Sequence, residues 1–245
     1  MGETFNLLSL SAFSGGKALA FNSSSERLHE VHADGSISAP LPDSARCASV
    51  ARIDGELFAC GSLDDVLGTR SQLVDIRDAA MNVRASMYHT SPRERSQMGH
   101  LFVASAGERV FVAETQAPQI RVFDVNGKEL RSIAMQGPAY RPPTMTLDAS
   151  RSNFTPWFRS FTPIVSLAAG GGYVGASYRV SPVAVHTVIF RISDGARVHD
   201  SARDDAFMLA CISADQFIFT DAISQINVYE GRDVTAGGPR AAPPK

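Results

Sequence analysis

Apolar and polar residues alternate in short runs along most of the chain, and residues 101–133 give the clearest example. This stretch contains four runs rich in β-branched and aromatic residues: LFVAS, RVFVAE, QIRVFD and ELRSI. Turn-forming pairs separate these runs, namely Ala106-Gly107, Ala117-Pro118 and Asn126-Gly127. A period of two is typical of half-buried strands, and Asn-Gly tolerates the positive φ angles of a tight hairpin. The stretch therefore predicts a four-stranded antiparallel meander.

The same pattern recurs along the chain, which indicates a repeat protein. A pair of apolar runs split by a small turn occurs five times, as NLLSLSAF-SGG-KALAF, ASVAR-IDG-ELFAC, LFVAS-AGE-RVFVA, IVSLA-AGGG-YVGAS and MLACI-SAD-QFIFT. A third run with its turn follows each pair: RLHEVHADG, QLVDIRDAA, QIRVFDVNG, TVIFRISDG and QINVYEG. The turns at Gly35, Ala79, Gly127, Gly195 and Gly231 are 44, 48, 68 and 36 residues apart. These spacings fit a repeat of roughly 40 residues with one large insertion.

This pattern resembles the β-propellers of the NHL and TolB-like type, which are usually six-bladed. The third-strand run QIRVFDVNGKELRSI and inner runs such as ERVFVAE and DQFIFTD carry the resemblance. It implies an all-β propeller in one domain over residues 1–235, with a Pro-, Gly- and Ala-rich tail at 236–245. Five four-stranded blades are recognisable. We expect a five-bladed ring, a six-bladed ring in which Met1–Phe13 and 136–161 supply an irregular blade, or an incomplete propeller that a partner completes.

Meander topology predicts where the long connections lie. The first and third turns of each repeat emerge on one side of the ring, and the second link and the link to the next repeat emerge on the other. All the long segments belong to the second group: 62–71, 86–99, 135–161 and 178–186. Because insertions gathered on one face of a repeat protein usually mark its binding face, we expect contacts with a partner there.

The insertion at 136–161 gives the candidate contact residues. It contains the only tryptophan of the chain, and aromatic and arginine side chains dominate protein interfaces. The candidates here are Tyr140, Arg141, Phe154, Trp157 and Phe158, with Arg93 and Arg95 of the 86–99 loop as charged contacts at the rim. Two other interpretations stay open: a lid that seals the hydrophobic core, and a lid over a small ligand.

An alternative hypothesis makes the same face a ligand site or a hydrolase. The ends of the second strands bring carboxylates toward one rim, and some five-bladed propellers with acidic residues on this face are glycosidases with paired carboxylates. The residues of this alternative are Asp64, Glu114, Tyr178, Arg179 and Asp221, with Asp65 beside the first of them. Carboxylates could also bind a cation. Near turns, however, they are more often solvated or bonded to turn amides.

Composition and motifs exclude several other functions. A net charge of -2 gives no basic field for nucleic acid. Gly170, Gly172 and Gly175 spell G-x-G-x-x-G, but no helix follows, so we expect a hairpin turn and no phosphate site. His29 and His32 are three residues apart on a strand and face opposite sides. We expect no metal and no cofactor.

The three cysteines and the apolar runs bear on location. An odd cysteine count within or beside apolar runs predicts buried free thiols in a reducing compartment. The beginning of the chain lacks an export signal, and no apolar run is long enough to span a membrane. We therefore expect a cytoplasmic protein, or an extracytoplasmic one if a signal peptide was removed.

These observations predict a non-enzymatic interaction or scaffold module, an accessory subunit of a larger assembly. Its expected partners are proteins, including subunits of a larger or membrane-associated complex. A hydrolase or small-ligand-binding propeller is the alternative.

Overall fold

The structure is a computed structural model that describes sixteen stretches of the chain. They are residues 7–12, 17–22, 25, 27–32, 34–41, 47–53, 57–62, 72–89, 100–135, 140–148, 150, 152–181, 183–203, 208–213, 216–220 and 226–230. Some of these residues, including 7–12, 17–19, 201–203 and 211, are described by their backbone alone.

The strands form five separate antiparallel sheets, and each sheet is one consecutive meander. The first sheet contains β1 (Leu7–Ala12), β2 (Lys17–Asn22) and β3 (Arg27–His32). The second contains β4 (Cys47–Arg52), β5 (Phe58–Ser62), β6 (Gln72–Arg77) and β7 (Val83–His89). The third contains β8 (Leu101–Ala106), β9 (Arg109–Glu114), β10 (Gln119–Asp124) and β11 (Glu129–Ala134). The fourth contains β12 (Ile164–Gly170), β13 (Tyr173–Ser181), β14 (Ala184–Arg191) and β15 (Arg197–Arg203), and the fifth contains β16 (Met208–Ser213), β17 (Gln216–Thr220) and β18 (Ile226–Glu230).

The predicted turns place these strands in register. Gly127 and Gly195 have φ angles of 84° and 76°, as the turns between the third and fourth strands of their sheets require. The three-glycine segment at 170–172 is a hairpin turn, since Gly170 pairs with Tyr173 across β12 and β13. The hairpin turn that was predicted for this glycine motif is therefore present.

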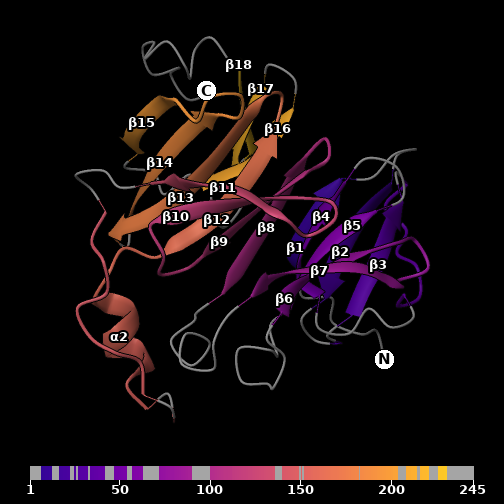
Figure 1. Cartoon of the computed structure of the whole chain (residues 1–245), viewed down its shortest axis with the longest axis horizontal. Coiled ribbons are helices and arrows are strands. Elements are labelled where there is room, and N and C mark those ends of the chain that lie inside the picture. Colours follow the sequence, from indigo (N-terminus) through magenta and orange to yellow (C-terminus); the bar gives the residue numbers. More distant parts are fainter. Residues whose placement is uncertain are drawn as a thin grey trace.

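The sheets pack side by side with apolar layers between them. The first strands of successive sheets, β1, β4, β8, β12 and β16, lie against one another in order, as the blades of a propeller do (Figure 1). One layer, with Leu73, Val74, Val110 and Val112, joins the second and third sheets. Further layers join the first to the second sheet, the third to the fourth and the fourth to the fifth. The predicted β-propeller fold is confirmed.

Two details differ from the predicted five four-stranded blades. In the described residues the first and fifth sheets have three strands each. Residues 36–41 only partly replace a fourth strand in the first sheet, through a bridge between Val31 and Ile37. The 136–161 insertion contains a helix, α2 (Phe154–Arg159), which lies outside the sheets at the lower left of Figure 1. Within the described residues, neither this insertion nor Met1–Phe13 forms a sixth sheet, because β1 belongs to the first one.

The expectation of free thiols was wrong for two of the cysteines. Cys47 of β4 and Cys60 of β5 form a disulfide with their Cα atoms 5.1 Å apart, within the apolar layer between the first two sheets. Paired strands can hold two Cys side chains at bonding distance, a proximity that spacing along the chain does not reveal.

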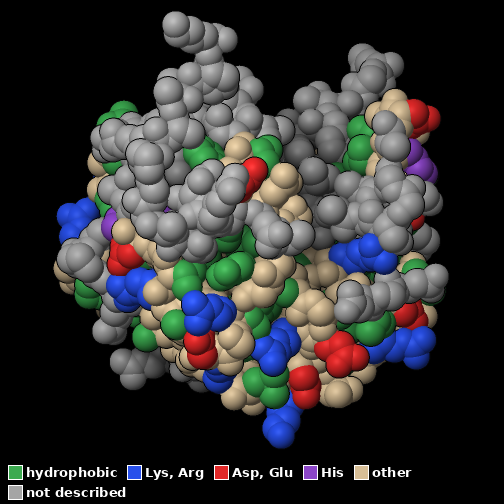
Figure 2. All heavy atoms as spheres, turned by 90° about the horizontal axis from the view of Figure 1, so that it is seen from above, with side chains coloured by type: hydrophobic (Ala, Val, Ile, Leu, Met, Phe, Trp, Pro, Cys, Tyr) green, Lys and Arg blue, Asp and Glu red, His purple; other side chains and the backbone are tan. Residues whose placement is uncertain are grey.

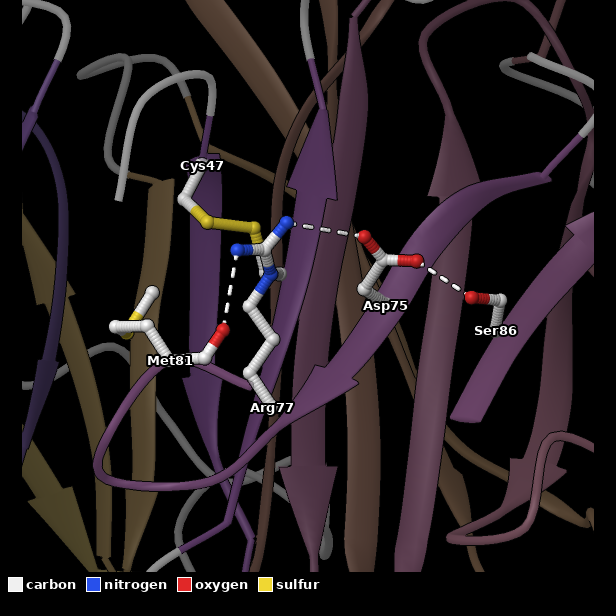
Figure 3. Close-up of polar contacts among 6 residues, drawn as sticks. Cys47, Asp75, Arg77, Met81 and Ser86 are labelled. Atoms are coloured by element: carbon white, nitrogen blue, oxygen red, sulfur yellow. Dashed lines mark hydrogen bonds and ion pairs between the residues drawn. A yellow bond between two sulfur atoms is a disulfide. The ribbon is translucent and has the colours of Figure 1, made fainter. Parts of the chain in front are cut away.

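Figure 3 shows the Arg77 guanidinium beside this disulfide. Arg77 donates to Asp75 Oδ2 at 3.2 Å and to the Met81 carbonyl at 3.3 Å.

The disulfide leads to a stability prediction. Because it closes a short loop in the unfolded chain, its reduction should lower the free energy of unfolding by about 3 kcal/mol. Thermal unfolding with and without dithiothreitol measures this difference. A Cys47→Ala/Cys60→Ala variant is the control, and its melting temperature should not respond to the reductant. Alkylation of all three cysteines in the unreduced, denatured protein would contradict the pairing.

Candidate functional site

The insertion is a loop closed at its base by hydrogen bonds. The backbone amide of Thr162 donates to the Arg141 carbonyl at 3.0 Å, and the Arg141 amide donates to Thr162 Oγ1 at 2.8 Å. Further along, the Asn153 side-chain amide donates to the Thr146 carbonyl and its oxygen accepts from the Asp148 amide, both at 2.8 Å. These bonds bring the two ends of the loop together and link its two sides.

A small hydrophobic core holds this loop together. Leu147, Trp157 and Phe161 are buried against one another, with Phe158 at the edge of the cluster. The Trp157 and Phe161 rings are 4.9 Å apart. Trp157 is only 2% exposed, so it stabilises the insertion from inside and is not the exposed contact residue that its residue type suggested.

Other candidate residues do face outward. Phe154 is 41% exposed, and its ring stacks on the half-buried Phe158 at 5.8 Å. Met145 is 43% exposed and directly precedes Thr146, the residue whose carbonyl accepts from Asn153. The two arginines of the described insertion, Arg141 and Arg159, are exposed as well. We call Met145, Phe154, Phe158, Arg141 and Arg159 the insertion surface.

Tyr140 connects the base of the insertion to the propeller. Its hydroxyl donates to the Gln116 carbonyl in the β9–β10 link at 2.7 Å, and its ring meets the Tyr178 ring edge-on at 6.1 Å. Burial raises the pKa of Tyr140 to about 12, so the hydroxyl stays protonated and keeps donating. Tyr140 is therefore a positioning residue for the insertion rather than a free contact residue.

Glu114, at the end of β9, lies in the seam between the second and third sheets. The hydroxyl of Tyr88, from β7, donates to Glu114 Oε1, and Gln116 Nε2 donates to Oε2 at 2.7 Å. Burial raises the pKa of Glu114 to about 7, an effect that the nearby Arg121 guanidinium partly offsets. Arg121 itself lies over the Tyr88 ring at 4.5 Å and pairs with Glu129 at 2.6 Å.

The backbone of Tyr88 is strained. Tyr88 is 2% exposed and has a φ of 64°, a left-handed conformation that non-glycine residues rarely adopt. Strain of this kind persists only where the surroundings fix it. The hydrogen bond to Glu114 and the Arg121 guanidinium over the ring hold Tyr88 in this conformation. These contacts join the second sheet, which carries Tyr88, to the third.

A second polar cluster lies on the fourth sheet, with residues from β13, β14 and β15. The Tyr178 ring stacks on His186 at 5.1 Å, and His186 is hydrogen-bonded to Asp200, which also accepts from Arg197 at 2.6 Å. Burial is the largest influence on Asp200, but these hydrogen bonds together outweigh it and keep its pKa below the usual value. Burial raises the pKa of Tyr178 to about 12, and among the described residues its hydroxyl has no hydrogen-bond partner.

The structure brings part of the alternative ligand set together. Glu114 and Tyr178 occupy matching ends of the second strands in neighbouring blades, and Gln116 and Tyr140 bridge them. Arg179 follows Tyr178, and its amide donates to the Pro163 carbonyl at 2.9 Å. The other candidates, Asp64, Asp221, Arg93 and Arg95, lie outside the described residues.

Sequence reasoning missed Tyr88, Gln116 and Met145. Tyr88 and Glu114 are 26 residues apart and belong to different blades, so only their seam brings them together. The turn signal at Ala117-Pro118 could have indicated Gln116, because a residue just before a tight link lies close to the end of its strand.

The described part of the chain offers neither a metal cluster nor a membrane-spanning helix. No group of three or more His, Cys, Asp or Glu side chains there is arranged to hold a metal ion. None of its helices has the length and apolar character needed to cross a membrane. On the face drawn in Figure 2, described side chains of both charges are interspersed.

Comparison with known proteins gives the fold class. No family model and no curated protein matches the chain. Among solved structures, the nidogen/laminin complex matches with a TM-score of 0.59 at 6% identity, over 92% of this chain and 76% of that one. KlHsv2 with loop 6CD replaced by a Gly-Ser linker matches with a TM-score of 0.54 at 11% identity. The match covers 90% of this chain and 63% of that one, so this chain spans less than two thirds of its length. Myxococcus xanthus glutaminyl cyclase matches with a TM-score of 0.52 at 10% identity, over 92% of this chain and 89% of that one. These likenesses support the β-propeller class.

Glu114 should make stability depend on pH. The pKa of Glu114 is about 7 in the folded protein and 4.5 in the unfolded chain. Its contribution to the free energy of unfolding is therefore fully present below pH 4.5. This contribution, at most about 3 kcal/mol, should be lost as the pH rises through 7. Glu114→Gln keeps the size of the side chain but cannot titrate, so its stability should fall less than that of the wild type between pH 5 and 8.

Urea unfolding of both proteins at each pH measures this difference. The comparison cancels the contribution of His100, whose pKa burial lowers, because both proteins share it. Parallel pH profiles for the wild type and Glu114→Gln would contradict a raised pKa at Glu114.

Proposed function

We propose that this chain is a non-enzymatic protein-interaction module that binds its partner through the insertion surface. One observation carries the proposal: the insertion has a core of its own and does not use Phe154 or Met145 to seal the propeller. A loop of fixed shape loses little conformational entropy on binding, and exposed aromatic and Met side chains provide apolar area. We place the chain as an accessory subunit of a larger assembly, of the NHL or TolB-like type that the third-strand pattern predicts.

Structural neighbours give this proposal some support. A match to a chain of the nidogen/laminin complex indicates that a propeller of this general fold takes part in a protein complex. That interaction belongs to the matched protein. The proposal for this chain rests on its own insertion surface.

The hydrolase alternative receives less support from the geometry. Both oxygens of Glu114 already accept hydrogen bonds, from Tyr88 and from Gln116, which suits a structural carboxyl better than one that attacks a substrate or transfers a proton to it. The match to Myxococcus xanthus glutaminyl cyclase indicates that this general fold also occurs in an enzyme. We keep the non-enzymatic function as the proposal.

The disulfide favours one of the two locations that the sequence left open. Disulfides persist in oxidising compartments and are rare in the cytosol. The Cys47–Cys60 bond therefore supports an extracytoplasmic location and weakens the cytoplasmic expectation.

Substitution of the exposed apolar pair tests the proposed function. Met145→Ala/Phe154→Ala should reduce recovery of native partners by about tenfold, since loss of a contact worth about 1.4 kcal/mol has that effect on affinity. Leu130→Ala is the matched control, because Leu130 on β11 is 47% exposed but lies on a blade. Affinity isolation with each variant, followed by quantitative mass spectrometry, gives the measurement.

The melting temperatures of both variants verify that the fold is intact. If Met145→Ala/Phe154→Ala retains every partner that the wild type binds, the insertion surface is not the binding site.

A further inference from the structure

The charge of the insertion differs from that of the rest of the chain. Residues 135–161 contain Arg141, Arg151 and Arg159 and one acidic residue, Asp148, which gives this segment a formal charge of +2. The whole chain has a net charge of -2, so the other residues together carry -4. The insertion is therefore a basic segment on an acidic protein.

The two described arginines of the insertion are also left without carboxylates. Within the described residues, neither Arg141 nor Arg159 forms an ion pair, and both side chains are exposed. Elsewhere in the described chain, Arg109 and Arg131 donate to the Ile192 carbonyl. Five other arginines pair with acidic residues of the fold: Arg77, Arg84, Arg121, Arg191 and Arg197. The guanidinium groups on the insertion thus remain available for a carboxylate from another molecule.

These arginines belong to the same hydrogen-bonded loop as the exposed apolar residues Met145 and Phe154. Arg141 is tied to Thr162 at the base, and the Thr144 amide donates to Ser160 Oγ at 3.4 Å, next to Arg159. Met145 follows Thr144, and Phe154 and Arg159 begin and end α2. One loop, closed by these hydrogen bonds, therefore carries two exposed large apolar residues and two exposed arginines without an ion pair in the described chain.

We propose that the insertion surface binds an acidic protein segment that carries an apolar anchor. This inference rests on the proposed function and specifies the chemistry of the partner. Phe154 and Met145 take the apolar side chain of that segment, and Arg141 and Arg159 pair with its Asp or Glu residues. Arginine suits this role because its planar fork bonds carboxylates at two points.

An anionic membrane is the other surface that basic and aromatic residues can recognise, and the observations favour a protein. Tryptophan is the side chain most characteristic of membrane interfaces, yet Trp157 points into the loop and is buried. Among the described residues of the insertion, the exposed large apolar side chains are one aromatic, Phe154, and one methionine, Met145, on a loop with a core of its own. Such a surface is suited to a defined side chain rather than to a lipid layer.

A peptide array provides the test. It presents peptides with a Phe-Leu pair at helical spacing, flanked by acidic, neutral or basic residues, and binding of the labelled full chain is measured at low and at high salt. The acidic set should bind most tightly and should weaken with salt, because exposed charge pairs are screened. Equal binding of the three sets, or no binding to any of them, would overturn the acidic partner.

Charge reversal separates this inference from the proposed function. Arg141→Glu/Arg159→Glu should weaken binding to the acidic set by about tenfold and should improve binding to the basic set. Arg141→Lys/Arg159→Lys should retain most of the binding to the acidic set. Arg84→Glu, on the exposed face of β7, is the control for a general change in net charge.

The pattern of outcomes is diagnostic. If Met145→Ala/Phe154→Ala loses binding but charge reversal has no effect, the insertion surface is still the interaction site. The inference that its partner is acidic would then be wrong. If phosphatidylcholine vesicles containing phosphatidylserine sediment the protein, and Arg141→Glu/Arg159→Glu prevents it while no acidic peptide binds, the ligand is a membrane and the inference is wrong.

Discussion

The apolar layers between neighbouring sheets are the interaction on which the rest of the structure depends. A single sheet would leave its apolar face exposed to water, and covering that face with another sheet removes the apolar area from solvent. Here each sheet covers the next, and two glycines allow their close approach. A Cβ on Gly61 would lie 2.9 Å from Val103 Cγ2, and one on Gly175 would lie 2.5 Å from Leu209 Cδ2. The propeller is therefore stabilised one seam at a time.

Polar side chains within the fold have partners of their own. Asp75 with Arg77 and Ser86, and His186 with Asp200, join strands of one sheet, whereas Glu114 with Tyr88 joins the second sheet to the third. An unpaired buried polar group is costly, so these partners fix the relative position of the strands that carry them. The bond between Glu114 and Tyr88 therefore acts between two blades, at a residue whose backbone is strained.

The insertion follows the same physical logic on a smaller scale. Its aromatic residues bury Trp157 and Phe161 against Leu147 and leave Phe154 outside, so a loop without strands acquires a stable shape. Tyr140 and the Arg141–Thr162 hydrogen bonds attach that shape to the ring. A binding surface that depends on its own core can differ from the blades in charge and in residue type without disturbing them.

The sequence by itself determined the repeat, and with it the fold. Strand periodicity and the turns at Gly127 and Gly195 are local properties, so they predicted the meander of 101–133 correctly. In the fourth sheet they located the turns, but most of the expected long connection at 178–186 belongs to the paired strands β13 and β14. The pattern also identified the insertion and two of its exposed residues, Arg141 and Phe154. It did not show that Trp157 turns inward, because burial depends on what packs around a side chain.

Only the tertiary structure decided the contacts between distant residues. Cys47 and Cys60 bond because β4 and β5 pair, and Tyr88 reaches Glu114 because two blades meet. The physical reason is the same in both cases: the spacing of residues along a strand sets which face they occupy, whereas the packing of strands and sheets sets which faces meet.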